Sequence, residues 1–162
     1  MLFCKQQRSN GLPGNNSASK DYKVSLLSAK FKEKQEKLEN LIAELVEESA
    51  KGKPIIAEGK KDAIALKTLG VNSTILTVKT GGKSFLKASQ EIEELGVLEV
   101  ILLLDFDRRG VEGTMRLVGD LEKLKIKANV KFWHQLRGLV SRDVQCIEGL
   151  PSFLMTLQQN AR

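Results

Sequence analysis

Residue types that form zinc sites and cross-links are scarce in this sequence of 162 residues. It contains two cysteines and one histidine, and Cys4 and Cys146 are far apart with no Cys-x-x-Cys spacing. Structural zinc needs about four Cys or His ligands, and disulfide frameworks need several paired cysteines. Neither a structural zinc site nor a disulfide framework is therefore expected to support this fold.

Long apolar runs are missing as well. The longest run, residues 100–104, has the length of a strand, whereas a membrane span needs about 18 to 20 apolar residues. Residues 1–20 lack the apolar stretch and the small-residue cleavage site of a secretory signal. With 41% hydrophobic residues, the chain has enough apolar material for one core. We expect a soluble, cytoplasmic, single-domain protein that does not contact a membrane.

Basic residues outnumber acidic ones, and they are unevenly distributed along the sequence. The formal net charge is +6, and between Leu121 and Arg142 six basic residues stand against one acidic residue, Glu122. Such a local excess attracts polyanions such as nucleic acid. It is equally typical of a solvated helix end and strand edge, so charge alone leaves both interpretations open.

The amino-terminal third of the chain divides into two segments. Residues 1–22 are rich in Asn, Gly, Ser and Gln and are predicted to be a flexible arm, whereas residues 23–52 are predicted to form an amphipathic helix. Four apolar residues repeat at intervals of seven: Val24, Phe31, Leu38 and Leu45. The neighbouring domain is the favoured cover for this stripe. A coiled-coil dimer through the helix is the alternative, disfavoured because Lys34 and Glu48 fall on its second seam.

Residues 53–162 alternate short β-branched runs with helical segments, which predicts an α/β domain with a mainly parallel sheet flanked by helices. The fourth strand is expected to end at Trp133, which we assign to the core. If strands one and three are neighbours, the strand order is 2-1-3-4. The expected strands are 54–57, 73–78, 99–104 and 128–133, and the expected helices are 60–69, 84–95, 112–124 and 151–159.

Acidic residues follow two of these strands directly. Glu58 and Gly59 follow the first strand, and Asp105-Phe106-Asp107 follows the third. Open α/β sheets bind their ligands at the carboxyl ends of the strands. Side chains alternate along an extended segment, so Asp105 and Asp107 are expected to point the same way, and the order 2-1-3-4 brings Glu58 beside them.

Three carboxylates at one edge call for a cation. Each pair repels by roughly 4 kcal/mol at 4 Å and an effective dielectric constant near 20. Mg²⁺ binds one or two protein carboxylates, keeps several waters and completes its shell with phosphate oxygens. The absence of clustered histidines or thiols argues against zinc or copper. A lone acidic motif often only caps a helix, but two motifs at alternate strand ends favour a Mg²⁺ site that Mn²⁺ can also occupy.

These motifs resemble those of a known family. The segment AEGKKDAIAL resembles the first motif of the Toprim family, and LLLDFDRRG resembles its second, DxDxxG, with the likeness covering about residues 54–133. The whole is similar to short stand-alone Toprim proteins of archaea and, more distantly, to the bacterial ribonuclease that matures 5S ribosomal RNA. The resemblance implies a three-layer, Rossmann-like Toprim domain and Mg²⁺-dependent phosphotransfer or nuclease chemistry. Asp105 and Asp107 would be metal ligands, and Glu58 a general acid/base or a ligand of a second metal.

Residues near the motifs are assigned supporting roles. Asp62 is expected to support the metal's outer shell or to interact with the dipole of its helix. Gly59 and Gly110 are expected to allow tight turns and to expose amides to phosphate. Arg108 and Arg109 can clamp phosphate, or pair with Glu112. The full set of candidate phosphate contacts is Lys60, Lys61, Lys83, Arg108, Arg109, Arg137 and Arg142.

Hydrolysis of RNA or DNA is the leading functional hypothesis. Primase-like nucleotidyl transfer ranks below it, because the zinc-binding and additional core segments of replicative Toprim primases are absent from this sequence. Topoisomerase activity needs a nucleophilic tyrosine, and the only one, Tyr22, lies far from the motifs. Phospho-receiver domains place their acidic pair after strand one, the reverse of this order. A non-catalytic module that binds RNA or a ribonucleoprotein is the alternative of a different class.

Overall fold

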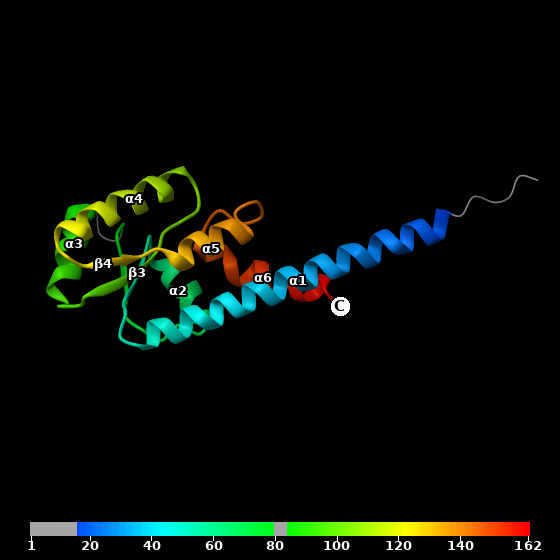
Figure 1. The fold of residues 1–162 in the computed structure, drawn as a ribbon, viewed down its shortest axis with the longest axis horizontal. Coiled ribbons are helices and arrows are strands. Elements are labelled where there is room, and N and C mark those ends of the chain that lie inside the picture. The colour runs from blue at the N-terminus through cyan, green and yellow to red at the C-terminus, as the bar shows by residue number, and fades with distance from the viewer. Residues whose placement is uncertain (1–15, 80–83) are drawn as a thin grey trace, which may run out of the picture.

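The computed structural model describes residues 16–79 and 84–162, and it shows a four-stranded sheet between helices (Figure 1). The elements, in chain order, are α1 (Asn16–Ala50), β1 (Ile55–Ala57), α2 (Lys60–Thr68), β2 (Ile75–Thr77), α3 (Phe85–Glu94), β3 (Glu99–Leu103), α4 (Arg108–Lys123), β4 (Lys127–Asn129), α5 (Lys131–Val140), a 3-10 turn (Ile147–Gly149) and α6 (Leu150–Asn160).

The sheet confirms the predicted topology. Its strands are all parallel and lie in the order β2-β1-β3-β4. Ile55 of β1 lies opposite Ile75 on one side and Ile101 on the other, so β1 and β3 form the centre. The side chains of β1 are all buried, as expected for a parallel strand covered on both faces.

Two apolar clusters lie on the two faces of the sheet. On one face, residues of α1, α5 and α6 pack with Ile55, Ile101 and Leu103. On the other, α3 and α4 pack with Ile56 and Leu102. The alternation of inward positions along β1 and β3 therefore builds a three-layer domain with its core on both sides of the central strands.

Helix α1 is longer than the sequence predicted. Residues 16–22, assigned to the flexible arm, continue the helix, and residues 1–15 lie outside the described part of the chain. No Gly or Pro occurs in residues 15–50, and extending an existing helix avoids the cost of nucleation. The domain covers the apolar stripe only from Leu38 onward, and Val24 and Leu27 stay exposed. In the described residues, no helix combines the length and apolar character of a membrane span.

Helix α4 begins at Arg108, four residues before the predicted start at residue 112. Gly110 and Gly113 weaken a helix signal in the sequence, because glycine is among the poorest helix formers. Packing explains why they are there. A Cβ on Gly110 would stand 1.9 Å from the carbonyl oxygen of Asp105, and one on Gly113 would stand 2.9 Å from the ring of Phe85.

The predicted fourth strand is correct only in its first part. β4 covers Lys127–Asn129, and residues 131–133 belong to α5, which the sequence analysis missed. Val130, Phe132 and Trp133 favour strand by propensity, but Asn129 accepts a hydrogen bond from the amide of Lys131 (3.1 Å) and starts a turn. Trp133 is buried as predicted, and its indole N–H donates to the carbonyl of Leu104 (3.0 Å).

Candidate acidic site at the carboxyl edge of the sheet

The two acidic motifs meet at the carboxyl edge of the central strands. β1 and β3 are neighbours with Ala57 opposite Leu103, so the residues that follow them come together. The amide of Asp105 donates to Oε2 of Glu58 at 3.4 Å. The predicted convergence of the first and third strand ends is therefore present in the fold.

Glu58 is paired with a cation that the sequence analysis did not identify. Its side chain is 10% exposed, and Oε1 forms an ion pair with Nζ of Lys79, the second residue after β2. β2 ends at the same edge as β1, because the strands are parallel and adjacent. A lysine just beyond a strand next to an acidic motif was the available signal.

Asp105 and Asp107 each engage one backbone amide. Oδ1 of Asp105 accepts from the amide of Ile147 (3.0 Å), and Oδ1 of Asp107 accepts from the amide of Gly110 (2.7 Å) as the N-cap of α4. The Oδ2 atoms of both aspartates accept no hydrogen bond from residues 16–79 and 84–162. Each aspartate is thus held in place through one oxygen while the other remains available.

The segment before α6 lies across this edge, and the sequence analysis gave its residues 145–148 no role in the site. Asp62, 6% exposed, accepts from the amide of Gly59 through Oδ2 (2.9 Å) and from the amide of Glu148 through Oδ1 (3.1 Å). The amide of Phe106 donates to the carbonyl of Gln145 (2.7 Å). Residues 145–148 are therefore fastened to both acidic motifs.

Gly59 and Gly110 were predicted to allow tight turns after the strands, and they do not use the left-handed region for this. Neither has a positive φ angle. A Cβ on Gly59 would meet only Oδ2 of Asp62, at 3.8 Å, so its amide matters more than its lack of a side chain. Gly110 is needed for close packing against Asp105, as described above.

Negative charge accumulates at the edge. Burial raises the pKa of Asp62 above its ordinary value, and the charge of Asp105 raises it further. Burial is also the main cause of the raised pKa of Asp105; Asp107 and Glu148 add to it, while the Ile147 amide and Lys79 oppose it. Burial, with a smaller effect of the carboxylates, raises the pKa of the Cys146 thiol. The charge at this edge would be relieved by a bound cation.

Several basic residues that were predicted to contact phosphate lie at the same edge, and they differ in exposure and in ion pairing. Lys60 and Lys61 are exposed in the first turn of α2, and Arg109 is exposed in the first turn of α4. Arg108, 91% exposed in its side chain, pairs with Glu112 (3.0 Å), which is the alternative that the sequence left open. Lys83 lies outside the described residues.

The two later arginines lie on and after α5. The guanidinium of Arg137 stacks over the ring of Trp133, 5.4 Å from its centroid. Arg142 is exposed just beyond the end of α5, next to Asp143, which pairs with Lys34 of α1 (2.6 Å). Both arginines therefore precede, in the chain, the segment that crosses the acidic edge.

Comparisons with known proteins identify the family of this chain. The model of the Toprim domain matches residues 52–132. A UPF0292 protein of Methanocaldococcus jannaschii is 38% identical over 120 residues, covering 74% of this chain and 91% of the relative. The chain belongs to the Toprim family. Toprim domains point to metal-dependent, nucleic-acid-related functions.

Two further matches show a second archaeal relative and a similar fold in a solved structure. A UPF0292 protein of Methanosarcina barkeri is 30% identical over 128 residues, covering 79% of this chain and 87% of the relative. A solved structure, a putative protein from Aquifex aeolicus, superimposes with a TM-score of 0.56 at 24% identity, covering 67% of this chain and 94% of that one. The Toprim match contains Glu58, Asp105 and Asp107, whereas residues 145–148 lie beyond it.

Toprim domains generally bind divalent metal ions, and the donor atoms here fit one in part. Within residues 16–79 and 84–162, no group of three Asp, Glu, His or Cys side chains is placed to hold a metal. Glu58, which the sequence groups with the two aspartates, forms an ion pair with Lys79. Mg²⁺ needs only one or two protein carboxylates, however. Asp105 and Asp107 each keep one carboxylate oxygen that accepts no hydrogen bond from the described residues.

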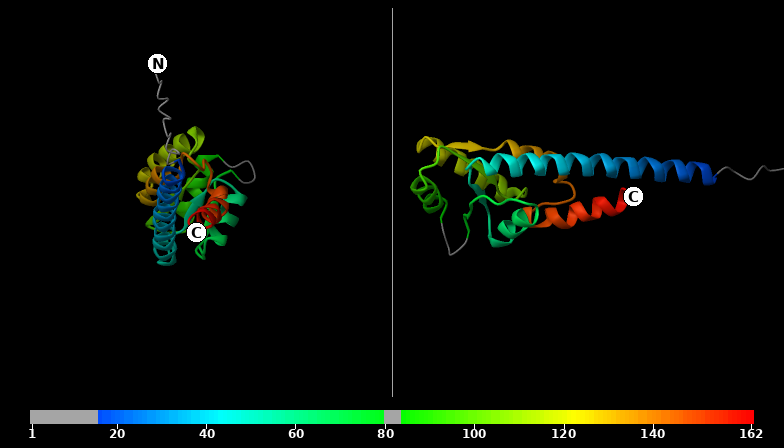
Figure 2. Two further views of the ribbon diagram at one scale, coloured as in Figure 1. Left: turned by 90° about the vertical axis from the view of Figure 1, so that its right-hand side faces the viewer. Right: turned by 90° about the horizontal axis from the view of Figure 1, so that it is seen from below.

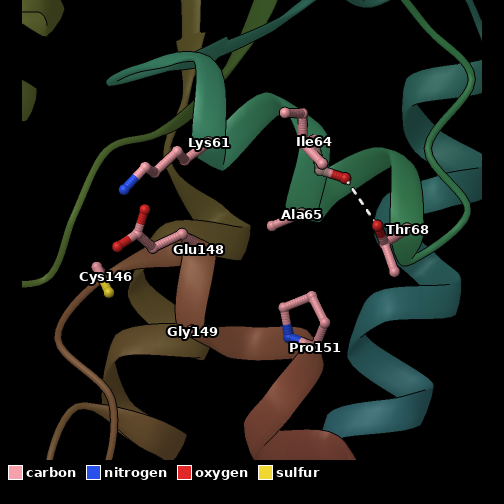
Figure 3. A pocket seen from close by; sticks show the side chains of 8 residues that line it. All are labelled: Lys61, Ile64, Ala65, Thr68, Cys146, Glu148, Gly149 and Pro151. Atoms are coloured by element: carbon pink, nitrogen blue, oxygen red, sulfur yellow. Dashed lines mark hydrogen bonds between the residues drawn. The ribbon is translucent and has the colours of Figure 1, made fainter.

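A cavity of about 470 Å³ lies beside the acids, between α2 and the 3-10 turn (Figure 3). In Figure 3, the side chains of Lys61 and Glu148 point toward one another across its mouth, with Cys146 below them. Ile64 and Pro151 form apolar walls. Glu148 is a further carboxylate of the site that sequence reasoning missed, because no strand end precedes it.

Proposed function

We propose that the protein hydrolyses phosphodiester bonds of RNA or DNA, using a divalent cation at Asp105 and Asp107. One observation carries the proposal: each aspartate is anchored through one oxygen to a backbone amide and keeps its other oxygen available. Anchored ligands keep their geometry when a cation arrives. A bound Mg²⁺ would neutralise the scissile phosphate and lower the pKa of a water molecule.

Glu58 is the proposed general base. Lys79 pairs with its Oε1, and the Asp105 amide holds Oε2 next to the aspartates. In the reaction, a water oxygen forms a bond to phosphorus as the bond to the sugar oxygen breaks. Glu58 accepts the proton of that water, and the leaving sugar oxygen takes a proton from solvent. A positioned base of this kind contributes about 10² to 10⁴ in rate.

The basic side chains of the edge are proposed to hold the flanking phosphates. Lys60, Lys61 and Arg109 are exposed at the starts of α2 and α4, where helix amides also face outward. Arg109 forms no ion pair with the described residues, so a phosphate would not have to displace a partner there.

Cleavage of labelled single- and double-stranded RNA and DNA in Mg²⁺ or Mn²⁺ tests the proposal. We expect wild-type protein to cut at least one substrate, and Asp105→Asn and Glu58→Gln to lose about 10²-fold or more in rate. Asp120→Asn is the matched control, since Asp120 lies near the other end of α4 and pairs with Lys123. Equal activity in all three variants would refute the assigned roles.

A non-catalytic nucleic-acid-binding module is the second candidate function. The pairing of Glu58 with Lys79, and the absence of a three-carboxylate group in the described residues, favour it. It predicts binding without cleavage, unchanged in Asp105→Asn and Glu58→Gln. The same assay, with binding measured beside cutting, separates the two functions.

A further inference from the structure

The outward half of α1, residues 17–33, extends beyond the rest of the fold. In Figure 1 it continues past α5 and α6, and the view from below in Figure 2 shows it passing the end of α6. Nearly all of its residues are exposed, including Tyr22, Val24 and Leu27. A helix face left open over this length needs an explanation.

One face of this helix carries a row of lysines, called here the lysine row. Its members are Lys20, Lys23, Lys30, Lys34 and Lys37, with Leu27 filling the gap. Steps of three, four and seven residues keep side chains on one face of an α-helix. The acidic residues Asp21 and Glu36 fall on other faces, and Glu33 lies at the margin of the row, where it pairs with Lys37 (2.6 Å). The row is therefore strongly basic.

The inner end of the lysine row is tied to the acidic site. Lys34 forms a 2.6 Å ion pair with Asp143, and Asp143 precedes Ile147 by four residues, at most about 14 Å of extended chain. The amide of Ile147 donates to Asp105. From Lys34 outward to Lys20 the helix rises about 21 Å. The row thus leads away from the segment that holds Asp105.

We propose that the lysine row is a docking surface for nucleic acid, on which the substrate strand continues as it leaves the acidic edge. Lys20, Lys23 and Lys30 form no ion pair or hydrogen bond with the described residues. Lysines spaced by three to seven residues lie about 4.5 to 10.5 Å apart along the helix. Phosphates of one strand recur about every 3.4 Å of rise, so each flexible lysine has one within reach.

Charge decides against a second copy of the chain on this face. Val24, Leu27 and Phe31 border or interrupt the row and supply apolar surface. A symmetric dimer through this face would place two lysine rows against each other, with no acidic row to match them. A polyanion suits the row, because each neutralised phosphate releases a counterion.

Binding measured without divalent cations tests the inference, which rests on the proposed nucleic-acid function but not on cleavage. The row variant carries Lys20→Glu, Lys23→Glu and Lys30→Glu. The matched control carries Lys51→Glu, Lys67→Glu and Lys123→Glu, which change the charge equally but lie where α1, α2 and α4 end, at the opposite edge of the sheet. Fluorescence anisotropy with labelled single-stranded and duplex RNA and DNA gives the affinities at several salt concentrations.

We expect the row variant to bind about tenfold more weakly or worse, with a salt slope smaller by about two, while the control stays within about threefold of wild type. Equal weakening in the row and control variants would reduce the effect to net charge and overturn the inference, as would no weakening in either. A dimer in light scattering that Phe31→Glu dissociates would assign the face to a second copy and overturn it too.

The outcome for the lysine row is separable from that for the acidic site. If the wild-type protein binds but does not cut, the proposed hydrolysis fails while the loss of affinity in the row variant still supports docking. If it cuts, the row variant should raise KM and leave kcat unchanged, because Lys20, Lys23 and Lys30 lie on the outward half of α1, which extends past α5 and α6. An unchanged KM in that case would contradict docking even if cleavage is confirmed.

Discussion

The amide of Ile147 donates a 3.0 Å hydrogen bond to Asp105, which lies 42 residues earlier in the chain. The next amide, that of Glu148, donates to Asp62 of the first motif. Consecutive amides of one 3-10 turn therefore hold an acidic residue from each motif. The segment before α6 is therefore part of the acidic site rather than an appendage to the domain.

The close approach of Gly110 to Asp105 predicts a large cost for a single methyl group. Gly110→Ala would place Cβ 1.9 Å from the Asp105 carbonyl oxygen, so the start of α4 must move. We expect a loss of about 2 to 4 kcal/mol in the free energy of unfolding, measured by urea denaturation.

Gly119→Ala is the matched control within the same helix. A Cβ there meets nothing within 4 Å, and alanine is the better helix former by about 1 kcal/mol. We expect this variant to equal or exceed wild type in stability. A Gly110→Ala protein as stable as Gly119→Ala would show that the contact with Asp105 is not tight.

The pH dependence of stability should reveal the cost of ionising the partly buried carboxyl group of Asp105. The pKa of Asp105 is raised in the folded state, chiefly by burial, so ionisation destabilises the fold. Stability associated with this group is fully present below its ordinary pKa of 3.8 and is lost as pH rises through the raised value. Asp105→Asn keeps an acceptor for Ile147 and removes the charge.

We therefore expect metal-free Asp105→Asn to be more stable than wild type near neutral pH, with the difference shrinking toward pH 3.8. Thermal melts across this range in the presence of a chelator measure it. Added Mg²⁺ should stabilise wild type and not the variant. If the difference in stability between the variant and wild type were the same at every pH, ionisation of Asp105 would not destabilise the fold.

The ion pair of Glu58 and Lys79 predicts a favourable interaction energy between the residues that follow β1 and β2. Lys79→Met removes the cation beside the carboxylate of Glu58, whose side chain is 10% exposed. Because the side chain of Lys79 is half exposed, water replaces part of its effect. We expect a loss of about 1 to 2 kcal/mol in the free energy of unfolding.

A double-mutant cycle with Glu58→Gln isolates the pair. Without the charge on residue 58, Lys79→Met should cost little, which gives a favourable coupling energy. Additive effects of the two substitutions would show that the pair contributes nothing in solution. That result would also leave Glu58 free to face a cation, as the sequence originally suggested.

Strand order and the meeting of Glu58 with Asp105 were predictable from the sequence. Both follow from local patterns: β-branched runs mark the strands, and parallel strands bring their carboxyl ends to one edge. The starts of α4 and α5 were not predictable in this way. Gly110 and Phe132 have local preferences against helix, and tertiary packing overrides them.

The residues missed at the site share a different cause. Ile147 and Glu148 act through their backbone amides. Nearly every residue type has such an amide, so the identity of the residue does not reveal this role. Lys79 was overlooked because its partner lies 21 residues away on a neighbouring strand end. That partnership places a cation against Glu58 that the predicted site did not include.

Calorimetric titration of Mn²⁺ or Mg²⁺ tests most directly whether Asp105 and Asp107 hold a cation. Wild type and the control Asp120→Asn should take up the ion equally, whereas Asp105→Asn and Asp107→Asn should each weaken uptake by about tenfold or more. Absence of uptake by the wild type, with and without a polynucleotide, or uptake that both aspartate variants retain, would contradict the account.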